Sequence, residues 1–329
     1  MSQAEVPLDV LAVGEVMGLL DPETDGPLED AGRFTLRIAG AEANVLIALS
    51  RLGHTTSLVS SVGTDPVGRL ILRTLKEQGV DTRRVHRDEG APSGIFFKER
   101  FSDGLRRVYY YREGSAASRL TPADARLHDI APPRFLVVSG LSLGLGRPGG
   151  LAAVARDALS RFASTSTMVV FDANLRPGLW DGELAERDFE QIRSQVDILL
   201  AGRDELAALT RGDADESAQR ICAEGMKAVV VKDGVRGAVL HDATGVTVID
   251  PYPVERIVDP VGAGDAFAAG LVCGLLRGWT PRDSSRLGAM LGASVVTASG
   301  DWEAVPTGPD PAALLAQYEA TLGLLEVRR

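Results

Sequence analysis

A glycine turn followed by an acidic residue is the part of the sequence best suited to chemistry. Residues 258–270 read VDPVGAGDAFAAG, and an apolar run begins directly behind Asp265. Gly262 and Gly264 would expose backbone N–H groups at the positive end of a helix dipole, which is a generic binding site for an anion. A carboxylate at this place could accept a proton from a hydroxyl group. The alternative is structural: Asp265 caps the helix, and small residues one turn apart allow close helix packing.

Two better-known phosphate-binding motifs are absent from the sequence. The chain contains no Gly-Lys dipeptide, which excludes a GxxxxGK[ST] loop. The VGAGDA turn lacks the third glycine of GxGxxG and lies far beyond the first βα unit, where a dinucleotide fingerprint is expected. An anion at this turn would therefore depend on the turn and the helix behind it.

Short apolar runs alternate with longer amphipathic stretches along most of the chain, and this alternation is typical of an α/β protein. Because the apolar runs are hydrophobic on both sides, we expect a buried, mostly parallel central sheet flanked by helices. The predicted strands are residues 8–15, 56–63, 135–140, 168–174, 196–202 and 228–234. The predicted helices are residues 44–52, 67–78, 150–161, 184–194, 204–209, 262–277 and 284–298. Residues 237–250 predict a late antiparallel pair of strands.

Two segments interrupt the alternation. Residues 93–113 contain two β-rich runs around Asp103-Gly104, a strong hairpin signal, and residues 34–40 form another β-like run. These segments could form a small second sheet that projects from the main domain. They could equally extend the edge of the central sheet, and the pattern alone leaves both arrangements open.

Composition limits the classes of partner. The chain has 329 residues, 45% of them hydrophobic, and a formal net charge of −10. This acidic balance excludes the basic face that nucleic-acid binders carry, so any anionic ligand must be held by local arginines. Neither a signal peptide nor a membrane span is apparent, and we expect a cytoplasmic protein. Cys222 and Cys273 lie among apolar neighbours and are predicted to be buried thiols.

Two motifs resemble the signatures of a known family. DPVGAGDAFAAG is similar to the C-terminal signature of the ribokinase, or PfkB, carbohydrate kinases, and IAGAEANVLIALSRLG (38–53) is similar to their N-terminal signature. The resemblance covers nearly the whole chain. It implies one ribokinase-like domain, residues 1–329, with a small β-sheet lid formed by segments about 15–40 and 93–113. It also implies that Asp265 is the catalytic base and that Gly262, Ala263 and Gly264 form the anion hole.

Several segments resemble the 2-keto-3-deoxygluconate kinases of that family in particular. These segments are Gly14-Glu15, GAEAN (40–44), YYYREGSAAS (109–118), DANLRPGLW (172–180) and SGDWEAVP (299–306). The resemblance implies substrate contacts by Gly40, Asn44, Tyr110, Arg112, Arg176 and Asp301. Arginine forks suit a carboxylate, and Tyr110 and Arg112 would share one face of a strand. The alternative for each is a solvated arginine or an aromatic ring packed under the lid.

The resemblance further implies ATP and Mg²⁺ as cofactors, and it allows a monovalent cation near the GAGD turn. Lys232, Gly234 and Gly237 match the family's KxGxxG pattern beside the nucleotide, although an ordinary glycine hairpin would look the same. Glu205 is the expected indirect metal contact, through water. The sequence departs from the family at Gly202, where Asn is usual. It departs again at Pro260, where many members have Thr, and at Phe96, where this subgroup often has Tyr.

The predicted activity is ATP-dependent phosphorylation of 2-keto-3-deoxygluconate at its terminal primary hydroxyl. The product would be 2-keto-3-deoxy-6-phosphogluconate, as in pathways of the Entner–Doudoroff type. Alternatives are another PfkB specificity, such as a fructokinase-like or deoxygalactonate kinase, or a non-catalytic sugar-acid-binding regulator. The expected partners are a sugar acid and ATP, with neither nucleic acid nor membrane. Association of copies through the lid is expected as well.

Overall fold

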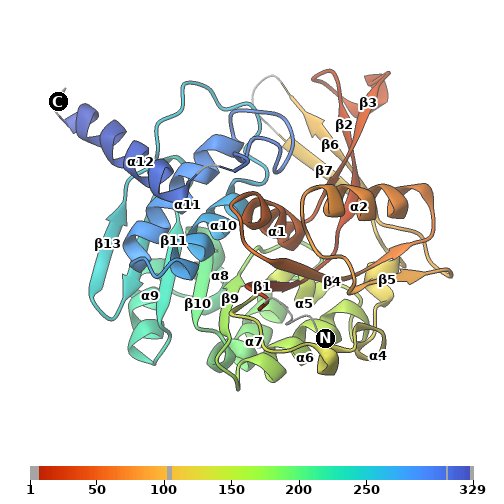
Figure 1. The fold of residues 1–329 in the computed structure, drawn as a ribbon, viewed down its shortest axis with the longest axis horizontal. Helices are drawn as coiled ribbons and strands as arrows, with labels where there is room; N and C mark the ends of the chain where they lie inside the picture. Colours follow the sequence, from red (N-terminus) through yellow and green to blue (C-terminus); the bar gives the residue numbers. More distant parts are fainter. Residues whose placement is uncertain (1–6, 102–105, 309, 327–329) are drawn as a thin grey trace, which may run out of the picture.

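A central sheet of nine strands forms the core of the computed structural model, which describes residues 7–101, 106–308 and 310–326 (Figure 1). Its strand order is β13-β12-β11-β10-β9-β8-β1-β4-β5. The strands are β1 (Val10–Val13), β4 (Thr56–Gly63), β5 (Val85–Asp88), β8 (Phe135–Ser139), β9 (Met168–Asp172), β10 (Ile198–Gly202), β11 (Ala228–Lys232), β12 (Ala238–Asp242) and β13 (Gly245–Ile249). Neighbours from β5 to β11 are parallel, and β12 and β13 follow as an antiparallel pair. The predicted mostly parallel sheet and late antiparallel pair are confirmed.

Helices cover both faces of this sheet. One face carries α1 (Ala41–Arg51), α2 (Pro66–Glu77), α10 (Ala263–Leu276), α11 (Pro281–Val295) and α12 (Pro311–Glu326). The other carries α3 (Ala116–Arg119), α4 (Pro122–Ala125), α5 (Gly140–Gly144), α6 (Gly150–Phe162), α7 (Gly182–Ile192), α8 (Arg203–Thr210) and α9 (Ala214–Ala223). Short 3-10 helices span Leu28–Asp30, Leu127–Asp129, Arg193–Gln195 and Gly234–Arg236. Val10 packs on the first face and its neighbour Leu11 on the second, which explains why the strands read as unbroken apolar runs.

The irregular segments form a second sheet, with strand order β3-β2-β6-β7. Its strands are β2 (Met17–Pro22), β3 (Phe34–Ala39), β6 (Ile95–Arg100) and β7 (Arg106–Tyr111). β2 pairs antiparallel with β3 and parallel with β6, and β6 pairs antiparallel with β7. This small sheet is separate from the central sheet, so the alternative of an extended edge is wrong. The predicted turn at Asp103-Gly104 lies outside the described residues.

Some elements differ from the prediction. Helix α1 begins at Ala41 rather than at Asn44, and β9 ends at Asp172 because Asn174 adopts a positive φ of 40° that cannot continue a strand. Helices α9 and α12 and strand β5 were not predicted. The apolar pattern of helix α9 is weak, because three of its four buried residues are small or polar.

Helices α10 and α11 pack with little space between their backbones. A Cβ added at Gly270 would lie 2.6 Å from the backbone of Gly288, and one at Gly274 would lie 2.5 Å from the hydroxyl of Ser284. The stripe of small residues predicted on α10 therefore serves helix packing. Within the described ranges, no helix is both long and apolar enough to cross a bilayer.

Candidate active site

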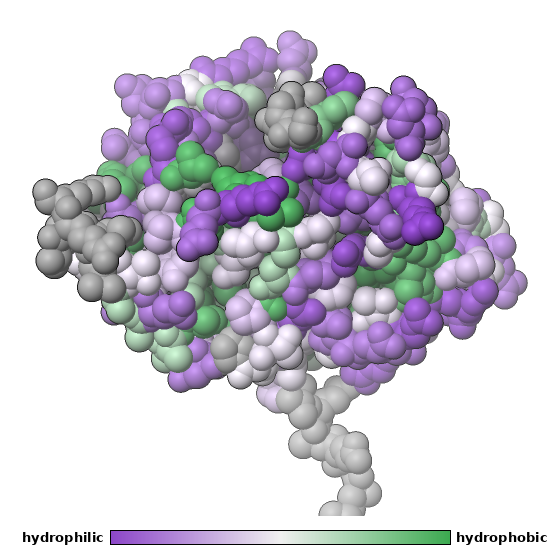
Figure 2. Space-filling view, turned by 90° about the horizontal axis from the view of Figure 1, so that it is seen from above, coloured by the Kyte–Doolittle hydropathy of each residue, from purple (hydrophilic) through white to green (hydrophobic). Residues whose placement is uncertain are grey.

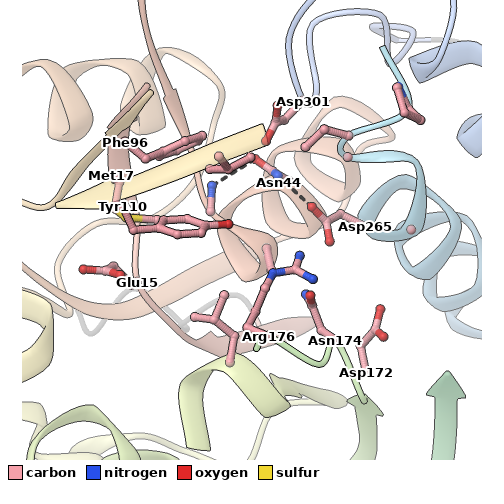
Figure 3. A pocket seen from close by; sticks show the side chains of 18 of the residues that line it. Glu15, Met17, Asn44, Phe96, Tyr110, Asp172, Asn174, Arg176, Asp265 and Asp301 are labelled. Atoms are coloured by element: carbon pink, nitrogen blue, oxygen red, sulfur yellow. Dashed lines mark hydrogen bonds between the residues drawn. The ribbon is translucent and has the colours of Figure 1, made fainter. Parts of the chain in front are cut away.

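A cavity of about 290 Å³ lies between the small sheet and the larger part of the molecule. The small sheet supplies Met17, Phe96 and Tyr110, and the opposite wall comes from the carboxyl ends of β9 and β11 (Figure 3). Ligands of open α/β sheets bind at this edge of the strands. The predicted site residues that the cavity brings together are Gly40, Asn44, Tyr110, Arg176, Glu205, Lys232, Gly262, Gly264, Asp265 and Asp301. Seen from above, the surface is mostly hydrophilic with separate hydrophobic areas, and it is hollowed toward the upper part of the view (Figure 2).

Asp265 lies in the first turn of α10 and faces Asn44 of α1 (Figure 3). The Asn44 side-chain amide donates a hydrogen bond of 2.7 Å to Asp265 Oδ2, and Asn44 Oδ1 accepts one of 3.3 Å from the Gly40 amide. Burial raises the pKa of Asp265 to about 7, although the bond from Asn44 favours the charged form. The alternative that Asp265 caps the helix is wrong, since the capping residue is Gly262. A carboxyl group tuned to this range suits proton transfer near neutral pH.

The turn before α10 is held in a conformation that only glycine adopts readily. Gly262 has φ 86°, and a Cβ there would lie 2.1 Å from the carbonyl oxygen of Asp301. Gly264 lies inside helix α10 and has no positive φ. The Ala263 amide donates to the Pro260 carbonyl at 3.3 Å. In the described ranges no backbone acceptor lies opposite the amides of Gly264 and Asp265, which leaves them for an anion.

Lys232 stands at the end of β11 beside this turn. Its ammonium donates to both carboxylate oxygens of Asp172, each at 2.8 Å, and a Cβ on Gly264 would lie 3.4 Å from Nζ. Burial alone would lower the pKa of Lys232, but attraction to Asp172 and Glu205 raises it, so the group stays charged. A fixed cation therefore lies next to the predicted anion site.

Glu205 is the residue predicted to act on a metal through water. Its oxygens accept hydrogen bonds from the Leu175 amide at 2.9 Å and the Gly202 amide at 2.6 Å, which leaves one further lone pair on each for water. The described ranges contain no group of three His, Cys, Asp or Glu side chains placed to hold a metal directly. The residues present fit an indirect contact, which stays a prediction.

Arg112 is the predicted substrate-binding residue that does not line this cavity. It is buried, its guanidinium lies 4.4 Å above the Tyr110 ring, and it pairs with Glu15 at 3.2 Å. Glu15 also accepts a hydrogen bond of 2.8 Å from the Ser115 hydroxyl, and it lines the cavity. Direct contact of Arg112 with a substrate stays a prediction; the structure shows its contacts with Tyr110 and Glu15.

Arg176 lies on the loop after β9 and reaches the cavity from below (Figure 3). The loop is closed by a hydrogen bond of 3.2 Å from the Arg176 amide to the carbonyl of Trp180, whose side chain is fully buried. Among the described residues, no carboxylate forms an ion pair with this guanidinium. Its Nη1 donates to the neighbouring Leu175 carbonyl at 3.0 Å. A half-buried guanidinium without a carboxylate partner among the described residues suits a carboxylate on a ligand.

Sequence reasoning missed four residues of the cavity that carry polar or flexible side chains: Glu15, Met17, Asp172 and Asn174. Asp172 and Asn174 follow a strand at its carboxyl end, a signal that could have identified them. Glu15 had been noted only as part of a segment that resembles the 2-keto-3-deoxygluconate kinases, with no role in the site. Met17 carries no signal that separates it from an ordinary core residue.

A second cavity, of about 590 Å³, lies on the other side of the turn. It is lined by Gly234, Gly237 and Ala263, together with exposed Val235 and Ile257. Lys232, Pro260 and Gly264 line both cavities. Two ligands, one in each cavity, would therefore meet at the turn and the lysine.

Comparison with known proteins agrees with this geometry. The family model described as pfkB family carbohydrate kinase matches residues 8–308. Proteins named 2-dehydro-3-deoxygluconokinase are 33% identical in Bacillus subtilis and 34% in Thermoproteus tenax. The first match covers 94% of this chain and 96% of the relative, and the second covers 95% of each. A 5-dehydro-2-deoxygluconokinase of Geobacillus kaustophilus is 30% identical over 92% of this chain and 91% of its own length.

Solved structures share the fold over nearly the whole chain. The 2-dehydro-3-deoxygluconokinase of Thermotoga maritima superposes with a TM-score of 0.83 at 25% identity, covering 95% of this chain and 99% of that one. A sugar kinase of Pyrococcus horikoshii, solved in complex with ATP, gives a TM-score of 0.77 at 25% identity. That match covers 93% of this chain and 99% of the other.

Proposed function

The chain belongs to the pfkB family of carbohydrate kinases, and we propose that it transfers a phosphoryl group from ATP to 2-keto-3-deoxygluconate. Kinase activity on a sugar acid follows from the family and from relatives that cover the chain. The finer proposal is that 2-keto-3-deoxygluconate is the acceptor and that its terminal primary hydroxyl is phosphorylated. This compound is also called 2-dehydro-3-deoxygluconate, the name used for the relatives. The observation that carries this proposal is the position of Asp265 and Arg176 in one cavity of about 290 Å³.

In this proposal the sugar acid lies in the first cavity, with its carboxylate on Arg176 and its hydroxyl on Asp265. Asp265 accepts the hydroxyl proton as the oxygen bonds to the γ-phosphorus and the bond to the β-phosphate oxygen breaks. The Gly262–Gly264 turn and the start of α10 stabilise charge on the transferred group. Lys232 adds a fixed cation at the meeting point of both cavities.

The nucleotide is proposed to occupy the second cavity. Gly234 and Gly237 line this cavity beside its apolar wall. A Cβ on Gly237 would lie 2.1 Å from the Ile249 carbonyl, so packing alone already requires a glycine there. The ATP complex of the Pyrococcus horikoshii kinase supports ATP as the donor. When bound, ATP and Mg²⁺ supply the phosphoryl group and neutralise its charge, and Glu205 would act through water.

The small sheet is proposed to act as a lid over the acceptor. Met17, Phe96 and Tyr110 cover the cavity from the small sheet, and their apolar surfaces would exclude water that competes with the sugar hydroxyl. Association of two copies is proposed at the small sheet, because Leu36, Tyr109 and Tyr111 lie exposed on it. Sedimentation of the purified protein tests this association. We also propose that the protein is cytoplasmic.

A phosphorylation panel tests the substrate. Purified protein with ATP and Mg²⁺ is offered 2-keto-3-deoxygluconate, its galactonate epimer, 5-dehydro-2-deoxygluconate, fructose and ribose, and ADP is measured by chromatography. We expect the highest kcat/KM with 2-keto-3-deoxygluconate. A higher kcat/KM with 5-dehydro-2-deoxygluconate, after which the Geobacillus relative is named, would make that sugar acid the proposed substrate. Preference for a neutral sugar would overturn the role of Arg176, and binding without ADP formation would indicate a regulator.

A further inference from the structure

A lysine of the small sheet is buried against two carboxylates of the larger part of the molecule. Lys98, in β6, is 1% exposed, and its ammonium donates to Asp259 Oδ2 at 2.9 Å and pairs with Asp301. Asp259 is fully buried, and Asp301 is nearly so. Lysine is almost never fully buried unless it is paired. Three distant segments therefore meet at one ammonium.

The two aspartates that hold the ammonium also contact the anion-binding turn. Asp259 Oδ1 accepts a hydrogen bond of 3.1 Å from the Val261 amide, directly before Gly262. The carbonyl oxygen of Asp301 fills the space where a Cβ of Gly262 would lie. A shift of either aspartate would thus displace the turn, and a displacement of about 1 Å near a reacting group can cost about 10²-fold in rate.

The two buried carboxylates need a positive charge beside them. Burial would lower the pKa of Lys98, but attraction to Asp301 and Asp259 raises it, so the ammonium stays charged. Arg106 adds a second cation, 4.0 Å from Asp259 Oδ1, and donates to the Val258 carbonyl at 2.7 Å. Two cations thus balance two acids. Loss of the ammonium would leave a buried negative charge beside the site for a phosphoryl group.

Other contacts join the small sheet to the same two loops, and one of them is also buried: the Trp302 indole donates to the Ile38 carbonyl at 2.9 Å. Ser299 donates to Asp21 at 2.7 Å, and Arg37 pairs with Glu303 at 3.0 Å. The arginine and the glutamate of that pair are each more than a fifth exposed, whereas Lys98 is sealed from solvent. Among these contacts, Lys98 is the buried ionic one, and it meets both carboxylates beside the turn.

We propose that Lys98 is a positioning residue for phosphoryl transfer: its fixed ammonium couples the small sheet to the anion-binding turn and takes the place of a bound monovalent cation at Asp259 and Asp301. This inference rests on the proposed function, because the turn is taken to hold the phosphoryl group. A monovalent cation was expected near this turn. In this proposal the ion's place is beside the carboxylates of Asp259 and Asp301, which already hold an ammonium. Nucleotide binding and turnover should consequently need no added potassium.

The first experiment uses the wild-type protein. Its affinity for a non-hydrolysable ATP analogue is measured by calorimetry in tetramethylammonium chloride and in potassium chloride of equal ionic strength, and ADP formation is measured in the same buffers. We expect a change smaller than about twofold in both, well below the tenfold step that 1.4 kcal/mol would give. A requirement for potassium in wild type would overturn the proposal. The affinity measurement does not depend on the sugar, so failure of the substrate assignment is seen separately, in the phosphorylation panel.

The second experiment uses Lys98→Met, which keeps the length of the side chain and removes its charge. We expect nucleotide affinity to fall at least about tenfold and kcat about 10²-fold. Methylammonium or potassium should restore at least part of both, an effect that lost packing would not show. Lys76→Met, on the exposed surface of α2, is the control and should behave as wild type. Wild-type behaviour of Lys98→Met, or a loss that no small cation restores, would overturn the proposal.

If Lys98→Met fails to fold, judged by circular dichroism, the double variant Lys98→Met/Asp259→Asn removes one of the two unpaired carboxylates as well. We expect this variant to fold, to bind nucleotide weakly and to respond less to potassium, because one anionic ligand is gone. Strong nucleotide binding without any cation in this double variant would contradict the role given to the ammonium.

Discussion

The side-chain amide of Asn44 donates a hydrogen bond of 2.7 Å to Asp265, joining the start of α1 to the first turn of α10. The bond spans the two segments that resemble the family signatures, so the fold brings both into one unit. Burial raises the pKa of Asp265 to about 7, and the hydrogen bond from Asn44 opposes this rise because it stabilises the charged form. The titration of Asp265 should therefore be visible in the pH dependence of both turnover and stability.

The pH dependence of wild-type kcat/KM should show an acidic limb near pH 7. A base acts only when deprotonated, and the raised pKa of Asp265 places that transition at about 7. Below it the rate should fall tenfold for each pH unit. A limb below about pH 5, where an ordinary aspartate titrates, would contradict the burial of the base.

Substitution of Asn44 by Ala should move this limb to higher pH. Removing the donor withdraws a bond that favours the carboxylate, so less of the base is charged at neutral pH, and kcat there should fall about tenfold. The rate should recover in part above pH 8. If KM for the sugar acid rises while the pH profile stays unchanged, Asn44 contacts substrate only and does not tune Asp265.

Asp265→Asn should stabilise the fold above neutral pH. Because burial raises the folded-state pKa of Asp265 to about 7, stability is lost as pH rises from the unfolded-state value of about 3.9 through about 7. The neutral amide avoids this loss, and it can still accept the bond from Asn44. The difference in Tm between variant and wild type should be absent at low pH, grow up to about pH 7 and then level off. A difference independent of pH would contradict the shifted titration.

Features that depend on a few neighbouring residues could be predicted from the sequence. The Gly262–Asp265 turn, the buried strands and the hairpin pattern of the small sheet could all be predicted, because glycine, double-sided hydrophobicity and period-two alternation act over a few residues. Arg176 and Lys232 were assigned to the site by the resemblance to the family, and the structure places them after and at the carboxyl end of a strand, respectively.

Contacts between distant segments could not be predicted from the sequence. Arg112 pairs with Glu15, 97 positions away along the chain, and Lys98 reaches Asp301 across 203 positions. No local pattern reports which acid a lysine or arginine will meet. Nor does any local pattern report that the carbonyl of Asp301, from another loop, fills the space where a Cβ of Gly262 would lie.

Gly262→Ala should destabilise the protein and slow turnover together. A Cβ there meets the Asp301 carbonyl at 2.1 Å in addition to the cost of a left-handed conformation, which is about 1–2 kcal/mol for other residues. Gly278→Ala is the matched control, because Gly278 has φ 78° and open space around its Cβ position. We expect a larger fall in Tm for Gly262→Ala, and loss of kcat only there. Equal effects in both variants would show that the conformation alone matters.

Arg176→Ala should separate a sugar acid from a neutral sugar. A charged hydrogen bond contributes about 1.5–3 kcal/mol, so kcat/KM for 2-keto-3-deoxygluconate should fall about 10- to 150-fold. A neutral analogue without the carboxylate should lose little, because it has no interaction there to forfeit. Arg187→Ala, on the exposed face of α7, is the control for loss of a positive charge. An equal loss for both substrates would assign Arg176 to structure or to the nucleotide.

The most direct test of the account is the turnover of Asp265→Asn, measured together with its affinity for the sugar acid. The variant keeps the shape of the side chain and its bond to Asn44 but cannot accept a proton. We expect kcat to fall about 10²- to 10⁴-fold while calorimetry shows the Kd of 2-keto-3-deoxygluconate within a few-fold of wild type. Turnover equal to that of wild type would show that Asp265 is not the base and would contradict the mechanism proposed for this site.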